Sequence, residues 1–211
     1  LQNLETAEDL KLFPLSYFAD TLVSFSDVAP VYNGKEVCRP VSFTVRRGER
    51  IALDGGNGSG KSSLLKLLEG EDIDHRGTVA VGSGLVISYV PQDTAGLAGS
   101  LSDFAEKKQI EESLFKAVLR KMGFERVHFE KQIEDLSAGQ KKKVLIAGSL
   151  CQRAHLYVWD EPLNYIDIYS RIQIENLIKK FSPAMIFVEH DAAFRKAAAT
   201  KTVEIYTLDN R

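Results

Sequence analysis

Eight consecutive residues, Gly55 to Ser62, constrain this chain more than any other stretch. They read Gly-Gly-Asn-Gly-Ser-Gly-Lys-Ser and fit the pattern G-x-x-x-x-G-K-[ST] at every fixed position. Arg50–Asp54 before them predicts a short buried strand, and Ser63–Leu68 after them predicts a helix whose leucines face inward. A glycine loop between a strand and a helix is the setting in which this pattern cradles phosphate. The stretch therefore predicts an α/β fold built around a nucleotide.

Backbone and side chains share the binding of phosphate in such a loop. The glycines let successive N–H groups curl around the phosphates, and the helix N-terminus adds partial positive charge. Lys61 is expected to reach the β- and γ-phosphates, and the Ser62 hydroxyl is expected to ligate Mg²⁺. A glycine-rich turn without a ligand is the alternative, which the flanking strand and helix disfavour. The nucleotide-binding residues expected here are Gly55, Gly56, Asn57, Gly58, Ser59, Gly60, Lys61, Ser62 and Ser63.

Composition limits the partners of the chain. Its 211 residues, 44% of them apolar, suffice for one globular domain with a small subdomain. No apolar run is long enough to cross a membrane and no signal peptide opens the sequence, so no membrane insertion is expected. The net charge of −2 requires any nucleic-acid contact to be local, or to come from parts of the protein outside this sequence. Cys38 and Cys151 lie in apolar settings, which predicts that both are small core residues rather than a disulfide or a metal site. Such cysteines fit a protein of a reducing, cytoplasmic compartment.

The first twenty residues differ from the rest. Asn3–Leu10 is acidic and could form a helix, which Pro14 would end. We interpret residues 1–20 as a linker or the tail of a preceding helix, in a fragment that begins at Leu1 rather than Met. From Thr21 onward the pattern is that of a folded domain.

Two alternating runs, Thr21–Val28 and Val41–Val45, predict antiparallel strands in front of the glycine loop. They place Tyr32, in the turn between them, near the nucleotide end of the domain. Tyr32 could stack on adenine or could be a half-exposed aromatic residue at a strand end, and the residues alone leave both open.

Strands and a helical insert follow the first helix. Gly77–Val81 and Leu85–Val90 predict strands, and Gln92 follows the second at the mouth of a loop. Ser100–Lys108 and Glu111–Met122 predict two helices of a small helical subdomain, about residues 100–136.

Leu136–Gln140 places small residues and a glycine just before a predicted helix, Lys141–Leu150. The N-terminus of that helix is a second place where an anion could bind. The three lysines that open the helix are predicted to form a solvated face rather than a ligand site.

Two later strands end in polar residues. The apolar run His155–Pro162 predicts a strand with two carboxylates at its C-terminal end. Asp160 suits a position near Mg²⁺. Glu161 should point the opposite way, because side chains alternate along a strand, and so toward a water that attacks the γ-phosphate. A charged pair without a ligand is the alternative. The strand Ala184–Val188 ends before His190, at the edge where ligands of open α/β sheets lie. The helix between them, Ile168–Lys180, is expected to turn Ile172, Leu177 and Ile178 inward, and a helix and a strand close the chain.

Together these motifs resemble the ATP-binding cassette (ABC) family over nearly the whole chain from about Thr21. The phosphate loop, Gln92, a signature at Leu136–Gln140, Asp160-Glu161 and His190 match in order. The resemblance implies a P-loop NTPase cassette over residues 21–211, with a mainly parallel core sheet, an N-terminal antiparallel β-subdomain and a small helical subdomain.

Within that family the chain looks most like the ABC-F class, cytoplasmic ATPases with two cassettes in one polypeptide. Asp160–Asp167 reads D-E-P-L-N-Y-I-D, which is similar to the ABC-F pattern D-E-P-T-N-H-L-D, whereas transporter cassettes usually read D-E-P-T-S-A-L-D. The Leu-Asn-Tyr-Ile variant resembles the branch that protects bacterial ribosomes from antibiotics. The chain would then be the second, C-terminal cassette, acting on the ribosome and its rRNA.

The resemblance also implies residue roles. Tyr32 would stack on the adenine of ATP. Ser62 and Gln92 would ligate Mg²⁺, supported by Asp160. Glu161, His190, Lys61 and Gln92 would form the catalytic set. Ser137 and Gly139, with Gln140 beside them, would cap the γ-phosphate of a partner's ATP, and Ala138 departs from the family by replacing a glycine.

A lone cassette of this kind carries two half-sites. Its partner would be a second cassette in the same polypeptide or a second copy in a head-to-tail dimer. The alternative function is the ATPase subunit of a membrane transporter, which a neighbouring permease gene would indicate. A chromosome-maintenance ATPase is disfavoured, because only 136 − 92 = 44 positions separate Gln92 from Leu136.

Overall fold

The computed structural model describes residues 10–208, which gather into two compact units. The sheet unit contains Pro14–Gln92, Ala154–Pro162 and the described residues from Ser182 onward. The helical unit contains Asp93–Arg153, Leu163–Phe181 and the described residues up to Phe13. The helix expected over Asn3–Leu10 falls almost entirely outside the described residues.

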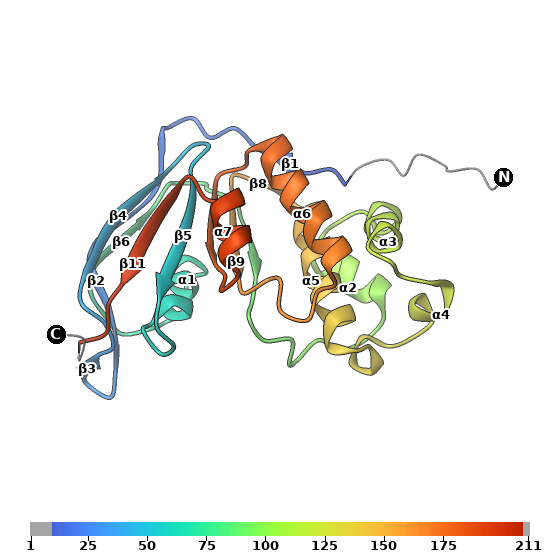
Figure 1. The fold of residues 1–211 in the computed structure, drawn as a ribbon, viewed down its shortest axis with the longest axis horizontal. Coiled ribbons are helices and arrows are strands. Elements are labelled where there is room, and N and C mark those ends of the chain that lie inside the picture. The colour runs from blue at the N-terminus through green and yellow to red at the C-terminus, as the bar shows by residue number, and fades with distance from the viewer. Residues whose placement is uncertain (1–9, 209–211) are drawn as a thin grey trace. The chain divides into compact units, whose positions relative to one another are not determined.

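A five-stranded parallel sheet forms the centre of the sheet unit (Figure 1). Every strand pair in it is parallel, and the strands β9 and β10 are buried along their whole length. This burial on both faces explains why their sequences are continuous apolar runs rather than alternating ones. In spatial order the strands are β11 (Lys201–Ile205), β5 (Arg50–Gly55), β10 (Met185–Val188), β9 (Leu156–Asp160) and β7 (Ile87–Val90).

An antiparallel sheet makes a second layer of the same unit. The predicted antiparallel pair is confirmed, although the first strand is longer than expected and runs on to Tyr32. Helix α1 (Lys61–Leu68) packs between the two sheets through Leu64 and Leu65, which are fully buried. Helix α7 (Ala192–Ala198) packs Phe194 edge-on against Phe187 of β10. The strands of the second sheet are β2 (Thr21–Tyr32), β3 (Lys35–Glu36), β4 (Val41–Arg46) and β6 (His75–Val81).

The segment expected to be a linker contributes to packing from Leu10 onward. Tyr17 is buried in the core of the sheet unit, and its hydroxyl donates to the carbonyl of Ser83 at 2.7 Å. Two short strands, β1 (Phe13–Pro14) and β8 (Arg153–Ala154), pair with each other.

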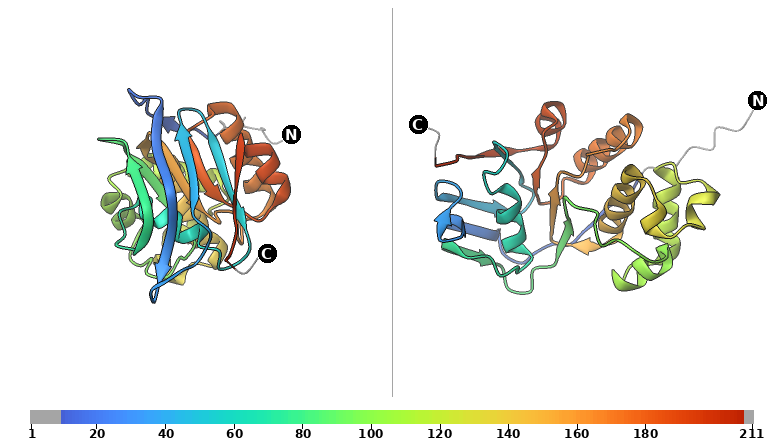
Figure 2. Two further views of the ribbon diagram at one scale, coloured as in Figure 1. Left: turned by 90° about the vertical axis from the view of Figure 1, so that its left-hand side faces the viewer. Right: turned by 90° about the horizontal axis from the view of Figure 1, so that it is seen from below.

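Helices make up the other unit (Figure 2). The two helices expected between residues 100 and 122 are present, and Ser100 caps the first through a reciprocal pair of hydrogen bonds with Asp103. Phe104 stacks on Phe115 and covers Gly148 so closely that a Cβ there would lie 2.8 Å from its ring. The elements are α2 (Leu101–Lys107), α3 (Glu112–Lys121), α4 (Arg126–Phe129), the 3₁₀ helix η1 (Ile133–Asp135), α5 (Ala138–Cys151) and α6 (Ile168–Phe181).

Two expectations about side chains were wrong. Ile172 does not face inward but is half exposed, because the buried face of α6 follows Ser170, Ile174, Leu177 and Ile178 at helical spacing. The three lysines are not a solvated face: Lys142 is buried and only 14% of the Lys143 side chain is exposed.

Both cysteines occupy the core positions that were predicted. Cys38 and Cys151 are buried free thiols, and burial raises the pKa of the Cys151 thiol to about 12. Within residues 10–208, every helix is too short or too polar to span a bilayer.

Candidate functional site

Three strands of the parallel sheet end at one edge of the sheet unit. The register pairs Val188 of β10 with both Leu53 of β5 and Asp160 of β9. The chain leaves β5 through the glycine loop, β9 through Glu161, and β10 through Glu189 and His190. Parallel strands thus bring together polar residues that lie far apart in the sequence, at the edge where ligands of open α/β sheets bind.

The glycine loop turns sharply at both ends. Gly55 has φ 155°, and a Cβ there would lie 2.4 Å from the carbonyl oxygen of Ile205. Gly60 has φ 86°, and its Cβ would lie 2.8 Å from a methyl group of Val37. Only glycine fits these two positions, so the loop can keep its N–H groups close to a bound phosphate.

Lys61 opens helix α1 and turns back over the loop. Its ammonium donates to the carbonyl oxygens of Gly55 at 2.7 Å and Gly56 at 2.8 Å, and the residue is only 7% exposed. Burial lowers the pKa of Lys61, while nearby carboxylates, chiefly Glu161, oppose that shift. A buried ammonium beside glycine backbone suits the neutralisation of phosphate charge.

A cavity of about 390 Å³ opens over the loop. Within residues 10–208, the buried hydroxyl of Ser59 in its wall has no hydrogen-bond partner, so a donor to a phosphate oxygen is available there. The predicted loop residues from Asn57 to Ser63 line this cavity together with the predicted Tyr32, Gln92 and Glu161. Gly55, Gly56, Asp160 and His190, which were also predicted, are not part of the lining, and Val37, which is, carried no signal in the sequence. The lining is Tyr32, Val37, Asn57, Gly58, Ser59, Gly60, Lys61, Ser62, Ser63, Gln92 and Glu161.

Tyr32 stands at the last position of β2, about half exposed. Its hydroxyl lies 2.8 Å from the Oγ atom of Ser63 in the first turn of α1, a hydrogen bond in which either group could donate. The phenol ring is therefore attached to the helix that begins at the loop, a contact that sequence patterns do not reveal.

The two carboxylates after β9 lie in different environments. Asp160 ends the strand and is 1% exposed. Glu161 follows with φ 46°, and its N–H donates to the carbonyl of Val188 at 2.9 Å. Strand alternation was thus the wrong reason for the direction of Glu161, because a left-handed backbone turn outside the strand sets it. The Oε1 atom of Glu161 lies 3.0 Å from the Nε2 atom of His190.

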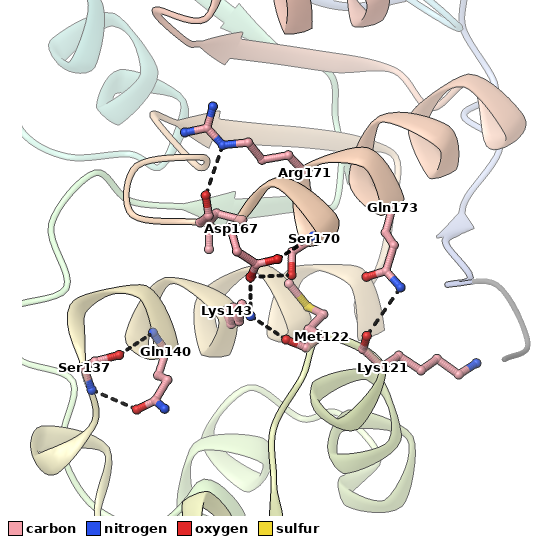
Figure 3. Close-up of polar contacts among 10 residues, drawn as sticks. Lys121, Met122, Ser137, Gln140, Lys143, Asp167, Ser170, Arg171 and Gln173 are labelled. Atoms are coloured by element: carbon pink, nitrogen blue, oxygen red, sulfur yellow. Dashed lines mark hydrogen bonds and ion pairs between the residues drawn. The ribbon is translucent and has the colours of Figure 1, made fainter. Parts of the chain in front are cut away.

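The predicted signature lies in the helical unit. Ser137 caps α5: its hydroxyl accepts from the N–H of Gln140 at 3.2 Å, and its own N–H donates to the side chain of Gln140 at 3.0 Å (Figure 3). Gly139 passes so near the carbonyl oxygen of Tyr165 that a Cβ would lie 2.5 Å from it. Ala138 is exposed, so the methyl group that replaces the family's usual glycine meets no close packing.

The described residues 10–208 contain no cluster of three or more His, Cys, Asp or Glu side chains that could hold a metal ion. Of the residues expected to hold Mg²⁺, Ser62 and Gln92 line the cavity, whereas Asp160 is not part of its lining.

Comparison with known proteins decides the family. The profile described as "ABC transporter" matches residues 38–164, which cover both the glycine loop and the carboxylate pair. The chain belongs to the ABC transporter family. It is an ATP-binding domain of that family, and such a domain implies ATPase activity.

Several relatives of this cassette belong to longer proteins. The ATP-binding protein YdiF of Bacillus subtilis is 31% identical over 190 residues, which are 88% of this chain and 29% of YdiF. The "Ribosome protection protein VmlR" of Bacillus subtilis is 27% identical over 174 residues, 80% of this chain and 31% of VmlR. "ABC transporter F family member 2" of Arabidopsis thaliana is 27% identical over 191 residues, 88% of this chain and 28% of that protein. The cassette thus spans about a third of the length of these relatives.

A solved structure shows the same fold. "Structure of ATP binding subunit of ABC transporter" superimposes with a TM-score of 0.73 at 22% identity, over 90% of this chain and 91% of that one. The expected architecture, a parallel core sheet with an antiparallel β-subdomain and a helical part, is therefore confirmed.

Proposed function

We propose that this cassette hydrolyses Mg-ATP within an ABC-F protein that acts on the ribosome and protects it from an antibiotic. The observation that supports the ribosomal part is the similarity to VmlR and to an F family member over at least four fifths of the chain. The ABC-F-like run Asp160–Asp167 agrees with it.

The phosphate-binding part of the mechanism uses the glycine loop. Its N–H groups and the Ser59 hydroxyl donate to the phosphates, and Lys61 leaves its carbonyl partners to neutralise them. Tyr32 stacks on the adenine. Ser62, Gln92 and Asp160 would hold Mg²⁺, which when bound would offset the negative charge of the phosphates.

Glu161 and His190 form the hydrolytic part. Glu161 accepts a hydrogen bond from the attacking water and takes up its proton as the water oxygen bonds to the γ-phosphorus and the bond to the bridging oxygen breaks, which releases ADP. The imidazole of His190, 3.0 Å from that carboxylate, holds it in place and contacts the γ-phosphate. Phosphoryl transfer depends mostly on positioning and on charge stabilisation, which this pair supplies.

A second cassette completes the site. Ser137 and Gly139, with Gln140 beside them, present the N-terminus of α5 to the γ-phosphate of the partner's ATP. The partner is a second cassette of the same polypeptide or a second copy of this one. ATP then closes the pair and hydrolysis reopens it.

Ribosome binding tests the proposal directly. Glu161→Gln in the full-length protein should bind ATP without hydrolysing it and should sediment with ribosomes in its presence. Adding Lys61→Met to that variant is the matched control, because it removes the phosphate-binding ammonium and should release the protein. No ATP-dependent sedimentation of the Glu161→Gln variant would overturn the ribosomal function.

The alternative is the ATPase subunit of a membrane transporter. The likeness to the solved transporter subunit described above, at 22% identity, is one of fold alone. A permease that purifies with the full-length protein, in place of ribosomes, would establish this alternative.

A further inference from the structure

One lysine side chain joins three segments of the helical unit (Figure 3). Lys143 lies in the second turn of α5, and its ammonium is 2.6 Å from the Oδ2 atom of Asp167. The same ammonium donates to the carbonyl of Met122, the residue that caps the end of α3, at 2.5 Å. Lys143 thus connects α5 both to α3 and to the segment that precedes α6.

Asp167 is fixed from the other side as well. Its carboxylate accepts from the N–H and from the hydroxyl of Ser170, both at 2.9 Å, and so caps helix α6. Burial raises the pKa of Asp167, but the hydrogen bonds from Lys143 and Ser170 outweigh burial and bring it down to about 2. The Asp167 side chain is therefore ionised at neutral pH.

The loop that ends at Asp167 is held along its length. Arg171 donates to the carbonyl oxygens of Leu163 and Ile166, both at 3.1 Å. Tyr165, between them, has φ 65° and turns its carbonyl oxygen against the backbone of Gly139. The loop Leu163–Asp167 therefore touches α5 at two places, Gly139 and Lys143.

These two contacts fix the orientation of α5. Gly139 and Lys143 are four residues apart, so they lie on one face of the helix, one turn from each other. Two contacts on one face prevent both rotation about the helix axis and sliding along it. Ser137 and Gly139 at the start of the helix are placed by the same contacts, because a helix of 14 residues is stiff over a single turn.

We infer that Lys143 is a positioning residue, which through Asp167 holds Ser137 and Gly139 in the geometry needed to meet a partner's γ-phosphate. The inference rests on the role proposed above for that segment. Lys143, the third lysine after the signature, thus has a specific role, although the run of three lysines in the sequence suggests only a solvated charge.

The test compares ATP turnover of variants of the full-length protein. Lys143→Met removes the ammonium, and Asp167→Asn removes the carboxylate charge but keeps a good helix cap. Each should lower kcat about tenfold, since small misplacements in an active site cost up to about a hundredfold, with KM changed less than about twofold. The double variant should be no slower than either single one, and Lys143→Arg should restore most of the rate. ADP binding should stay the same, because ADP has no γ-phosphate.

Reference measurements separate the possible failures. Ser137→Asp keeps the helix cap but sets a negative charge against the γ-phosphate, so it should lower kcat by itself. If it does and Lys143→Met or Asp167→Asn does not, the positioning role is wrong and the proposed function stands. If Ser137→Asp does not lower kcat, the proposed role of the signature is wrong, and the positioning role of Lys143, which rests on it, is wrong as well. A lower unfolding temperature of Lys143→Met with unchanged kcat would show that Lys143 has a structural role only. If Lys143→Met does not fold, the kcat of Asp167→Asn tests the positioning role instead.

Discussion

The Nε2 atom of His190 lies 3.0 Å from the Oε1 atom of Glu161, although the two residues are 29 positions apart in the chain. The parallel pairing of β9 with β10 produces this proximity, because it aligns the carboxyl ends of the two strands. Glu161 lines the cavity over the glycine loop, and an imidazole beside its carboxylate is an arrangement suited to positioning an attacking water.

The first prediction concerns this pair. His190→Ala should lower kcat about a hundredfold, because an unsupported Glu161 loses its orientation, while ATP affinity should change little. The measurement is steady-state ATP turnover together with nucleotide binding. His75→Ala is the matched control, since His75 is exposed and its ring Nδ1 atom lies 2.8 Å from the carbonyl oxygen of the nearby Ile73. Equal turnover of the two variants would exclude a catalytic part for His190.

A second prediction tests Tyr32. If its ring stacks on adenine, Tyr32→Leu should weaken ATP binding about fivefold, from the loss of about 1 kcal/mol of aromatic contact. Tyr32→Phe keeps the ring and loses only the hydroxyl bond to Ser63, so it should cost less. Titration with ATP and with GTP measures both effects. Equal affinities for Tyr32→Leu and the wild type would leave Tyr32 as a strand-end aromatic residue.

The phosphate loop could be predicted from the sequence because its geometry is local. Strand, loop and helix are contiguous, and the left-handed positions can be read from the glycines themselves. The backbone turn that sets the direction of Glu161 could not be predicted from the sequence. Its φ of 46° is left-handed, and the residue is not a glycine, which is the usual sequence signal for such a conformation.

Long-range contacts explain the other misses. Lys143 looked solvated because its partner, Asp167, follows 167 − 143 = 24 residues later. Periodicity identified α6 as amphipathic but included Ile172 in its buried face, while the small polar Ser170 occupies a buried position by bonding to Asp167. Charge runs and apolar spacing carry no information about such tertiary partners.

A third prediction concerns the close approach of α5 to the loop before α6. Gly139→Ala should destabilise the fold by about 1–3 kcal/mol, because its Cβ would lie 2.5 Å from the carbonyl oxygen of Tyr165 and backbone would have to move. Thermal or urea unfolding measures the loss. Gly56→Ala is the matched control: its Cβ meets nothing within 4 Å and its φ is not left-handed. Equal stability of both variants would contradict the close contact.

The last prediction is the pH dependence of the Lys143–Asp167 pair. The pKa of Asp167 is about 2 in the folded protein, against 3.8 for an ordinary aspartate. A carboxyl whose pKa is lower in the folded state binds fewer protons there than in the unfolded state. Its stabilising contribution is therefore complete above about pH 4 and is lost as the pH falls toward 2.

Unfolding temperatures of the wild type and Asp167→Asn should accordingly differ at pH 6 and converge as the pH falls from about 4 toward 2. Asp20→Asn is the control, because Asp20 is well exposed and its ion pairs with arginine side chains are long, 3.8 and 3.9 Å. Exposed pairs of that kind contribute little to stability, so this substitution should leave the unfolding temperature almost unchanged at every pH. A constant difference between the wild type and Asp167→Asn down to pH 2 would show that the carboxylate charge of Asp167 does not stabilise the fold, and that any effect of the substitution comes from the helix cap alone.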